Sequence, residues 1–229
     1  MTTQDLIPSI SAHTEKLLDT ARSLTDQGAP TLCEGWTAGH VLSHVARNAD
    51  GLAGLVRSAV DGTGETMYAS PQARDADIDA GAGRPIDVLV EDVRASADRV
   101  NPLLTRLGPE HDAIMVDRTP GVPFAPAGRL PFVRLREVVY HHVDLDSGFG
   151  FEDVEPGLAL IFLDEEVTRL RRVDAPPDLT LASTDGEEWT VGKGTARVSG
   201  SRTALLGWLA RGARTGLDTT SLPDLPAGR

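Results

Sequence analysis

Two histidines and one glutamate are spaced along the chain in a way that suits a metal ion. Glu137 and His141 are four residues apart, and His44 lies far upstream. Residues four apart on a helix share one face, about one turn or 5.4 Å apart, so Glu137 and His141 can bind the same ion. A zinc site that performs chemistry keeps three protein ligands and leaves a fourth position open. The spacing therefore indicates a catalytic zinc site that His44 completes from a second helix.

The composition limits the kinds of partner. The 229 residues include 34 acidic and 22 basic side chains, which give a formal net charge of −12. Because affinity for a nucleic-acid backbone depends on clustered lysine and arginine, we expect no nucleic-acid partner. No apolar run is long enough to span a membrane, and the first residues lack the pattern of a signal peptide, so we expect a cytoplasmic protein with no membrane partner.

Cys33 is the only cysteine of the chain. It excludes an internal disulfide and a cysteine-based zinc cluster. No basic residue adjoins Cys33 in the sequence, so an inert thiol is the favoured interpretation. Any thiol chemistry must therefore use Cys33 or a thiol borrowed from a small molecule.

The hydrophobic pattern of the first 150 residues predicts four helices and two long connections. The helices are expected over residues 3–27, 36–60, 85–107 and 131–146. A polar, glycine-rich stretch over 61–83 is expected to be a connection, and the proline-rich stretch over 108–130 a loop without a regular element. Four-helix bundles build metal sites from inward side chains on facing helices, which suits the proposed ligands.

The pattern changes after Gly150. One helix is expected over 156–173, followed by three strand-like segments and a last helix. The strand-like segments are 179–184, 187–192 and 195–200, and the helix is 201–211. These elements predict a small α+β domain. The expected organisation is thus a four-helix bundle over residues 1–150 and an α+β domain over 151–229.

Helical phase separates the histidines of the segment 36–60. At about 100° per residue, His44 lies roughly 90° from the centre of the apolar stripe and His40 roughly 130° from it. His44 can therefore reach an interior site, whereas His40 is expected to face solvent. Asn48 lies one turn after His44 and nearer the interior, where it can orient a metal ligand or cap a buried carbonyl. The alternative for His44 is a packed or solvated histidine without a metal.

Helical phase supports the second ligand pair less well. The apolar stripe of the segment 131–146 passes through His142 and not through His141. Phase alone therefore predicts that His142 is buried, as a core histidine. Glu137 and His142 are five apart and diverge, so a site with His141 requires a polar pocket on the flank of the stripe. Asp144 and Asp146 are expected to be solvated or capping groups.

The segments around the proposed ligands resemble a known family. Residues 35–50 (GWTAGHVLSHVARNAD) and 136–145 (REVVYHHVDL) resemble the two signatures of the mycothiol-dependent maleylpyruvate isomerase family, within the DinB-like metal-binding bundles. Met67-Tyr68 followed by Arg74 and Arg84 is similar to the segment that connects these signatures in the isomerase. The C-terminal domain resembles the small sterol-carrier-like module of that family, so the resemblance covers essentially the whole chain.

The resemblance implies a cofactor and a role for several residues. It implies zinc on His44, Glu137 and His141, which are then the catalytic residues, and mycothiol as the borrowed thiol. An arginine near the end of the last helix of the family faces the site. Here the segment is WLARGAR, in which arginine and glycine are exchanged, so that the arginine is either Arg211 or Arg214.

The implied reaction is the cis–trans isomerisation of maleylpyruvate to fumarylpyruvate in gentisate-type aromatic degradation. A thiolate that adds to the conjugated double bond permits rotation, and its elimination restores the double bond. Zinc is expected to lower the pKa of the thiol or to polarise the substrate carbonyl. Arg84 and Arg211 are expected to hold carboxylates, because guanidinium binds carboxylate in a fork. Asn48 is expected to support the site.

Two other functions stay open on the sequence. A mycothiol S-transferase acting on electrophiles would use the same zinc and thiol without a dedicated dicarboxylate pocket. A non-catalytic metal-binding regulatory protein of the same bundle family would hold the metal but would need neither the thiol nor a dicarboxylate pocket. A monomer is expected in each case.

Overall fold

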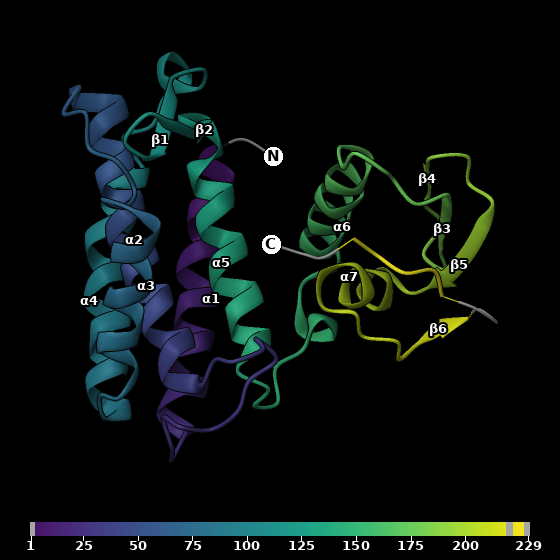
Figure 1. The fold of residues 1–229 in the computed structure, drawn as a ribbon, viewed down its shortest axis with the longest axis horizontal. Helices are drawn as coiled ribbons and strands as arrows, with labels where there is room; N and C mark the ends of the chain where they lie inside the picture. Colours follow the sequence, from purple (N-terminus) through teal and green to yellow (C-terminus); the bar gives the residue numbers. More distant parts are fainter. Residues whose placement is uncertain (1–2, 219–221, 227–229) are drawn as a thin grey trace. The chain divides into compact units, whose positions relative to one another are not determined.

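Four long helices build the N-terminal part of the computed structural model, which describes residues 3–218 and 222–226. They are α1 (Thr3–Ser23), α2 (Ala38–Asp61), α4 (Ile86–Leu104) and α5 (Leu130–Asp144). Helices α1 and α2 each pack against both α4 and α5, which closes a bundle (Figure 1). All four correspond to helices that the sequence predicts. The predicted fold class, a helical bundle followed by a small α+β domain, is confirmed.

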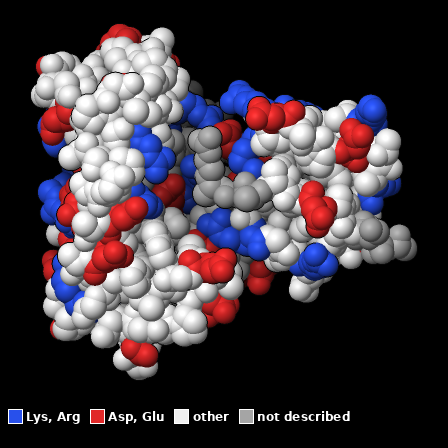
Figure 2. Space-filling model, viewed as in Figure 1, with Lys and Arg blue, Asp and Glu red and all other residues white. Residues whose placement is uncertain are grey.

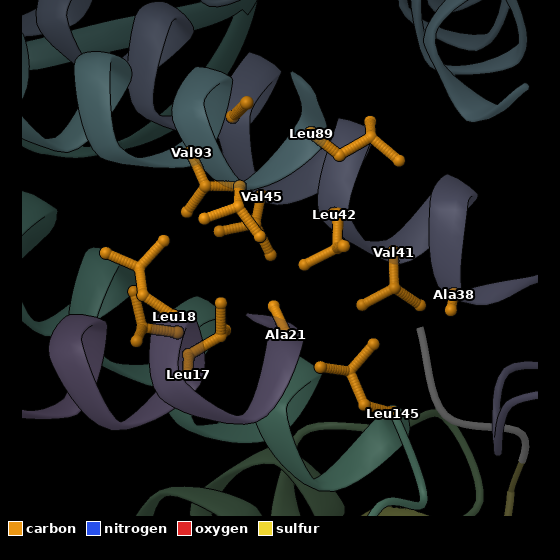
Figure 3. Close-up of a cluster of buried hydrophobic side chains, with 13 residues drawn as sticks. Leu17, Leu18, Ala21, Ala38, Val41, Leu42, Val45, Leu89, Val93 and Leu145 are labelled. Carbon is orange, nitrogen blue, oxygen red and sulfur yellow. The ribbon is translucent and has the colours of Figure 1, made fainter. Parts of the chain in front are cut away.

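Aliphatic side chains fill the space between the bundle helices. Figure 3 shows leucine, valine and alanine side chains of α1, α2 and α4 meeting in one cluster, which Leu145 joins from the end of α5. Leu17, Leu42 and Leu89 are fully buried within it. Burial of each such side chain contributes about 1.5–3 kcal/mol to folding. This buried cluster therefore holds together the helices that carry the proposed ligands.

Residues 61–83 are not the plain connection that the sequence predicts. They contain helix α3 (Pro71–Ala82), capped by the Ser70 hydroxyl, which accepts a hydrogen bond from the Ala73 amide at 3.0 Å. The helix is rich in alanine and aspartate, and Ile78 is its one large buried apolar side chain among the described residues. Hydrophobic periodicity could not reveal it, because its other non-polar residues are small or are proline, and one isoleucine does not mark a stripe.

Residues 108–130 also contain regular structure, contrary to the prediction. Strands β1 (Met115–Thr119) and β2 (Val122–Pro126) form an antiparallel hairpin around Gly121, whose φ of 75° suits glycine. Short 3-10 turns, η1 (Pro109–His111) and η2 (Ala127–Arg129), flank it. Prolines argue against a central strand, but a two-stranded ribbon consists only of edges and tolerates them.

The C-terminal unit spans Phe149–Arg229 and the N-terminal one Met1–Gly148, whereas the sequence analysis divides the chain at residue 150. It contains η3 (Phe151–Asp153), two helices and a four-stranded sheet in the order β4-β3-β5-β6. The helices are α6 (Pro156–Arg171) and α7 (Arg202–Arg211), and the strands β3 (Leu179–Ser183), β4 (Glu188–Val191), β5 (Ala196–Gly200) and β6 (Leu217–Asp218). The short turn η3 and strand β6 are absent from the prediction. Strands β3 and β5 pair in parallel and the other pairs are antiparallel.

Acidic and basic side chains are interspersed on the visible face of each unit (Figure 2). Within the described residues, we find no helix whose length and apolar character would let it cross a membrane.

Candidate metal centre

The first turn of α2 sets the direction in which its histidines point. Thr37 precedes the helix in an extended conformation, and its backbone N–H donates to Nδ1 of His40 at 3.2 Å. His40 therefore closes the start of the helix, which leaves it outside the ligand cluster. Its side chain is about a quarter exposed (24 %), less than the solvent-facing position that the sequence predicts.

His44, Glu137 and His141 converge where α2 meets α5. Nε2 of His44 lies 3.0 Å from Oε2 of Glu137, and Nε2 of His141 lies 3.6 Å from the same oxygen. One ligand atom from each residue lies within 4.8 Å of the others. The two imidazole rings meet edge to face, with centroids 4.6 Å apart. The three residues that the sequence selects by spacing are thus brought together.

The donor set and its spacing fit a zinc ion. Imidazole nitrogen and carboxylate oxygen bind zinc at about 2.0–2.2 Å, so two donors of a tetrahedral ion lie about 3.4 Å apart. The separations of 3.0 and 3.6 Å between the imidazoles and Glu137 bracket this value. The side chains of His44, Glu137 and His141 are 6, 17 and 13 % exposed, so that the cluster is enclosed by protein yet open to solvent.

The charges of the cluster depend on its burial and its hydrogen bonds. Burial lowers the pKa of His44 to about 4, against the effect of its bond to Glu137. Burial alone would raise the pKa of Glu137, but hydrogen bonds from His141 and His44 outweigh it and hold the pKa well below its usual value. For His141, bonds to Asp144, Cys33 and Glu137 outweigh burial and raise the pKa well above its usual value. A negative carboxylate therefore lies at the centre of the cluster.

Asp144 determines the orientation of the His141 ring. Its Oδ2 lies 2.8 Å from Nδ1 of His141, and its side chain is completely buried. Metal-binding histidines commonly use the second ring nitrogen in this way, which directs the first one to the ion. The prediction that Asp144 is solvated or a cap is wrong. The Cys33 thiol donates to the same oxygen at 3.2 Å, so Cys33 also lies beside the cluster.

His142 is the buried histidine that helical phase predicts. It is 1 % exposed, and its Nε2 lies 2.7 Å from the hydroxyl of Thr20 on α1. His142 therefore faces α1, whereas His141 faces α2. His141 lies on the flank of the apolar stripe among polar groups, the carboxylates of Glu137 and Asp144.

Trp36 and Arg74 border the cluster, although the sequence analysis assigns neither of them to the site. The Trp36 ring lies 5.3 Å from the His44 ring and 6.2 Å from that of His141. The guanidinium of Arg74, on α3, lies over the Trp36 ring at 5.8 Å, and its Nη2 is 3.4 Å from Nδ1 of His44. Since α3 itself is missed by periodicity, no pattern in the sequence places Arg74 beside His44.

Two glycines permit the close approach of α3 to α2. A Cβ atom at Gly39 would lie 2.0 Å from the carbonyl oxygen of Ala82, and one at Gly81 would lie 2.1 Å from Oγ of Ser43. Neither distance is possible for real atoms, so any larger residue would force the helices apart. The approach brings Arg74 to the cluster.

The other predicted site residues have different surroundings. Asn48 donates from Nδ2 to Oε2 of Glu137 at 3.2 Å, beside the cluster. Arg84 forms an ion pair with Asp92 at 2.6 Å and donates to the Gly81 carbonyl. Arg211 lies in the last turn of α7, in the other unit, and donates to the carbonyl of Ala210 at 2.8 Å.

The fold and the cluster define a class of protein: a helical bundle with a candidate His₂Glu metal centre, joined to a small α+β domain. The family model for the mycothiol maleylpyruvate isomerase N-terminal domain matches residues 10–146. The chain belongs to this family of enzymes, which confirms the resemblance seen in its sequence.

Solved structures agree with the family assignment. A crystal structure of the mycothiol-dependent maleylpyruvate isomerase superposes with a TM-score of 0.88 and 25 % identity, over 99 % of this chain and 97 % of that one. A histidine-to-alanine variant described under the same name gives a TM-score of 0.87 at the same identity and coverage. No curated protein sequence matches the chain significantly.

Proposed function

We propose that this chain is a zinc- and mycothiol-dependent isomerase that converts maleylpyruvate to fumarylpyruvate. The observation that carries the proposal is the convergence of His44, Glu137 and His141 in a bundle whose solved relatives are described as mycothiol-dependent maleylpyruvate isomerases. The chemistry of these three donors fits zinc and leaves one coordination position free.

His44, Glu137 and His141 would hold the zinc ion. Bound there, zinc supplies a Lewis acid that lowers the pKa of a thiol, and the mycothiol thiol supplies the nucleophile that adds reversibly to the conjugated double bond. The contribution of the protein is to hold these three side chains in place before the reactants arrive. Asp144 does this for His141, and Asn48 for Glu137.

We assign Trp36 and Arg74 to the shielding of the cluster and to the binding of the reactants. The indole of Trp36 covers one side of both histidine rings and limits the access of water to the cluster. Arg74 offers a cation directly beside His44. A dicarboxylate substrate and a thiolate are both anionic, so Arg74 can hold one of them by charge and hydrogen bonding. Arg74 and Arg84 each form an ion pair at 2.6 Å, with Asp75 and Asp92 respectively. Asp75 is exposed and Asp92 mostly buried, so the pair of Arg74 is the easier one to exchange for a reactant, and Arg84 is the weaker candidate for this role.

A pocket next to Arg74 offers room for a reactant. It has a volume of about 460 Å³, and its walls come from α2, α3 and the segment between them. Tyr68 lines it, and the Arg74 guanidinium lies 5.9 Å from the Tyr68 ring. The same arginine therefore borders both the pocket and His44. We propose that the pocket accepts part of the substrate or of the thiol.

One assay distinguishes the three candidate functions. The zinc-loaded protein is incubated with maleylpyruvate and mycothiol, and the trans product and any thiol conjugate are measured by chromatography. We expect fumarylpyruvate to form only when mycothiol is present. Stable conjugates of electrophiles without isomerisation would instead support an S-transferase, and zinc binding without turnover would support a regulatory protein. A cytoplasmic location and a monomeric state remain predictions from the sequence.

A further inference from the structure

Arg134 is a charged residue inside the bundle that the proposed chemistry does not use. It lies on α5, one turn before Glu137, and its side chain is completely buried. Burial lowers its pKa to about 10, so the guanidinium is still positive at neutral pH. Its Nη1 donates to the carbonyl of Val45 at 2.9 Å and to Oδ1 of Asn48 at 3.3 Å. Within the described part of the chain, Nε and Nη2 have no hydrogen-bond partner.

The contacts on both sides of Asn48 specify a single orientation of its amide. A guanidinium only donates hydrogen bonds, so Oδ1 must face Arg134. An ionised carboxylate only accepts them, so Nδ2 must face Glu137. The resulting chain runs from Arg134 through Asn48 to Oε2 of Glu137, the oxygen that lies nearest both imidazoles. Among the described residues, Arg134 is the hydrogen-bond donor to Oδ1, so its loss removes the bond that opposes rotation of the amide.

We propose that Arg134 is a positioning residue for the metal centre, which orients Asn48 and thereby fixes the Glu137 carboxylate. The inference rests on the proposed binding of zinc by His44, Glu137 and His141. It differs from a purely structural role, in which the bond to the Val45 carbonyl merely ties α5 to α2. In the structural role, the effects of Arg134 and Asn48 on zinc affinity are independent of each other.

A double-mutant cycle separates these roles. Zinc dissociation constants of the native protein, Arg134→Met, Asn48→Ala and the double variant are measured by competition with a chromogenic chelator. We expect each single variant to bind zinc about 10-fold more weakly, as loss of a ligand-orienting partner typically does. Because both act through one contact chain, the double variant should also be about 10-fold weaker. Unchanged affinity in Arg134→Met, or a multiplied loss of about 100-fold in the double variant, would overturn the proposal.

Three further variants complete the test. Arg134→Lys keeps a donor on a long side chain, so zinc affinity should recover to within about 3-fold of native. Arg136→Met removes a positive charge that lies 3.8 Å from Oε1 of Glu137, without touching Asn48. It should leave zinc affinity nearly unchanged, and an effect equal to that of Arg134→Met would show that charge alone matters. If Arg134→Met does not fold, Arg134→Gln, which is too short to reach Asn48, takes its place.

A measurement on the metal-free protein keeps the inference separate from the proposed function. The side-chain amide NMR signals of Asn48 should move to the position of a free asparagine amide in Arg134→Met and stay in place in Arg136→Met. Unchanged signals in Arg134→Met would overturn the inference even if zinc binds. A native protein that binds no zinc would overturn the proposed function, whereas the amide signals would still decide whether Arg134 orients Asn48.

Discussion

A buried aspartate gives His141 a fixed orientation. Asp144 has no exposed surface, and its carboxylate contacts both Nδ1 of His141 and the thiol of Cys33. A carboxylate in such a place costs free energy unless it is hydrogen-bonded, so these two contacts also explain why it is tolerated. At the residue scale, the candidate centre therefore depends on groups behind the ligands as well as on the ligands.

We predict that Asp144→Asn weakens zinc binding by about 10-fold or more, because the amide accepts a hydrogen bond from His141 less strongly than a carboxylate. The zinc dissociation constant, measured by chelator competition, provides the test. Asp146→Asn is the matched control: Asp146 is exposed, and its φ of 49° is readily adopted by asparagine. Equal zinc affinity in both variants would contradict the role given to Asp144.

We predict that Arg74→Met raises the KM for an anionic reactant by about 10-fold, the loss of one charge-assisted hydrogen bond, with little change in zinc content. Steady-state kinetics against maleylpyruvate and against mycothiol would show which of the two is affected. Arg94→Met is the control. It removes a solvent-accessible ion pair between Arg94 on α4 and Glu15 on α1, and it should leave both KM values unchanged. The role of Arg74 would be wrong if neither KM rose.

Sequence reasoning located the candidate ligands and one supporting residue, Asn48, which donates to Glu137. It did not find the other residues around them. Glu137 and His141 are four residues apart, which places them on one face of a helix, and this spacing can be read from a single sequence. Asp144, Arg74 and Trp36 act through contacts that depend on how α2, α3 and α5 meet, and a single sequence does not display those contacts. The choice between His141 and His142 came from the resemblance to the family, because helical phase indicates only which of the two is buried.

At the scale of elements, the close packing of α3 on α2 places Arg74 beside the candidate ligands. The two helices approach so closely that Gly39 on α2 almost touches the Ala82 carbonyl at the end of α3. This approach cannot be read from hydrophobic periodicity, since Ile78 is the one large apolar side chain of α3. For the same reason the sequence analysis describes residues 61–83 as a connection. The bundle helices, with continuous apolar stripes, were predicted to within a few residues.

We predict that Gly39→Ala lowers the free energy of unfolding by about 1–3 kcal/mol, the usual cost of forcing extra volume into a packed contact. Chemical denaturation measures this change. The variant should also raise the KM in the manner of Arg74→Met, because α3 carries Arg74. Gly83→Ala is the control, since a Cβ atom there meets nothing within 4 Å and its φ of −82° suits alanine. Equal stability of the two variants would refute the close packing.

At the scale of the whole molecule, the candidate centre lies entirely within the N-terminal unit. The C-terminal unit has its own buried cluster between α6, α7 and the sheet. Strands β3, β4 and β5 have strand-like sequences separated by turns, so they were predicted from the sequence. Strand β6 has only two residues, too few to show a pattern. The one role that the sequence resemblance assigns to this unit, an arginine near the end of α7 that acts in the reaction, stays a prediction.

We predict that Arg211→Met slows the thiol-dependent isomerisation by about 10-fold or more, the loss of one anion contact, and leaves zinc content unchanged. Arg211 is half-buried on a helix, which suits a binding role better than Arg214, which is exposed beyond the helix end. Initial rates at fixed mycothiol concentration give the comparison. A normal rate for Arg211→Met combined with a slow rate for Arg214→Met would transfer the role to Arg214.

The most direct measurement of the central claim is the zinc content of purified protein by atomic emission, for the native chain and for His44→Ala, Glu137→Ala, His141→Ala and His142→Ala. We predict about one zinc ion per chain in the native protein and in His142→Ala, and little in the other three variants, because a three-ligand site loses most of its affinity with any one ligand. Full zinc content in all of the variants would contradict the assignment, as would loss of zinc from His142→Ala and not from His141→Ala.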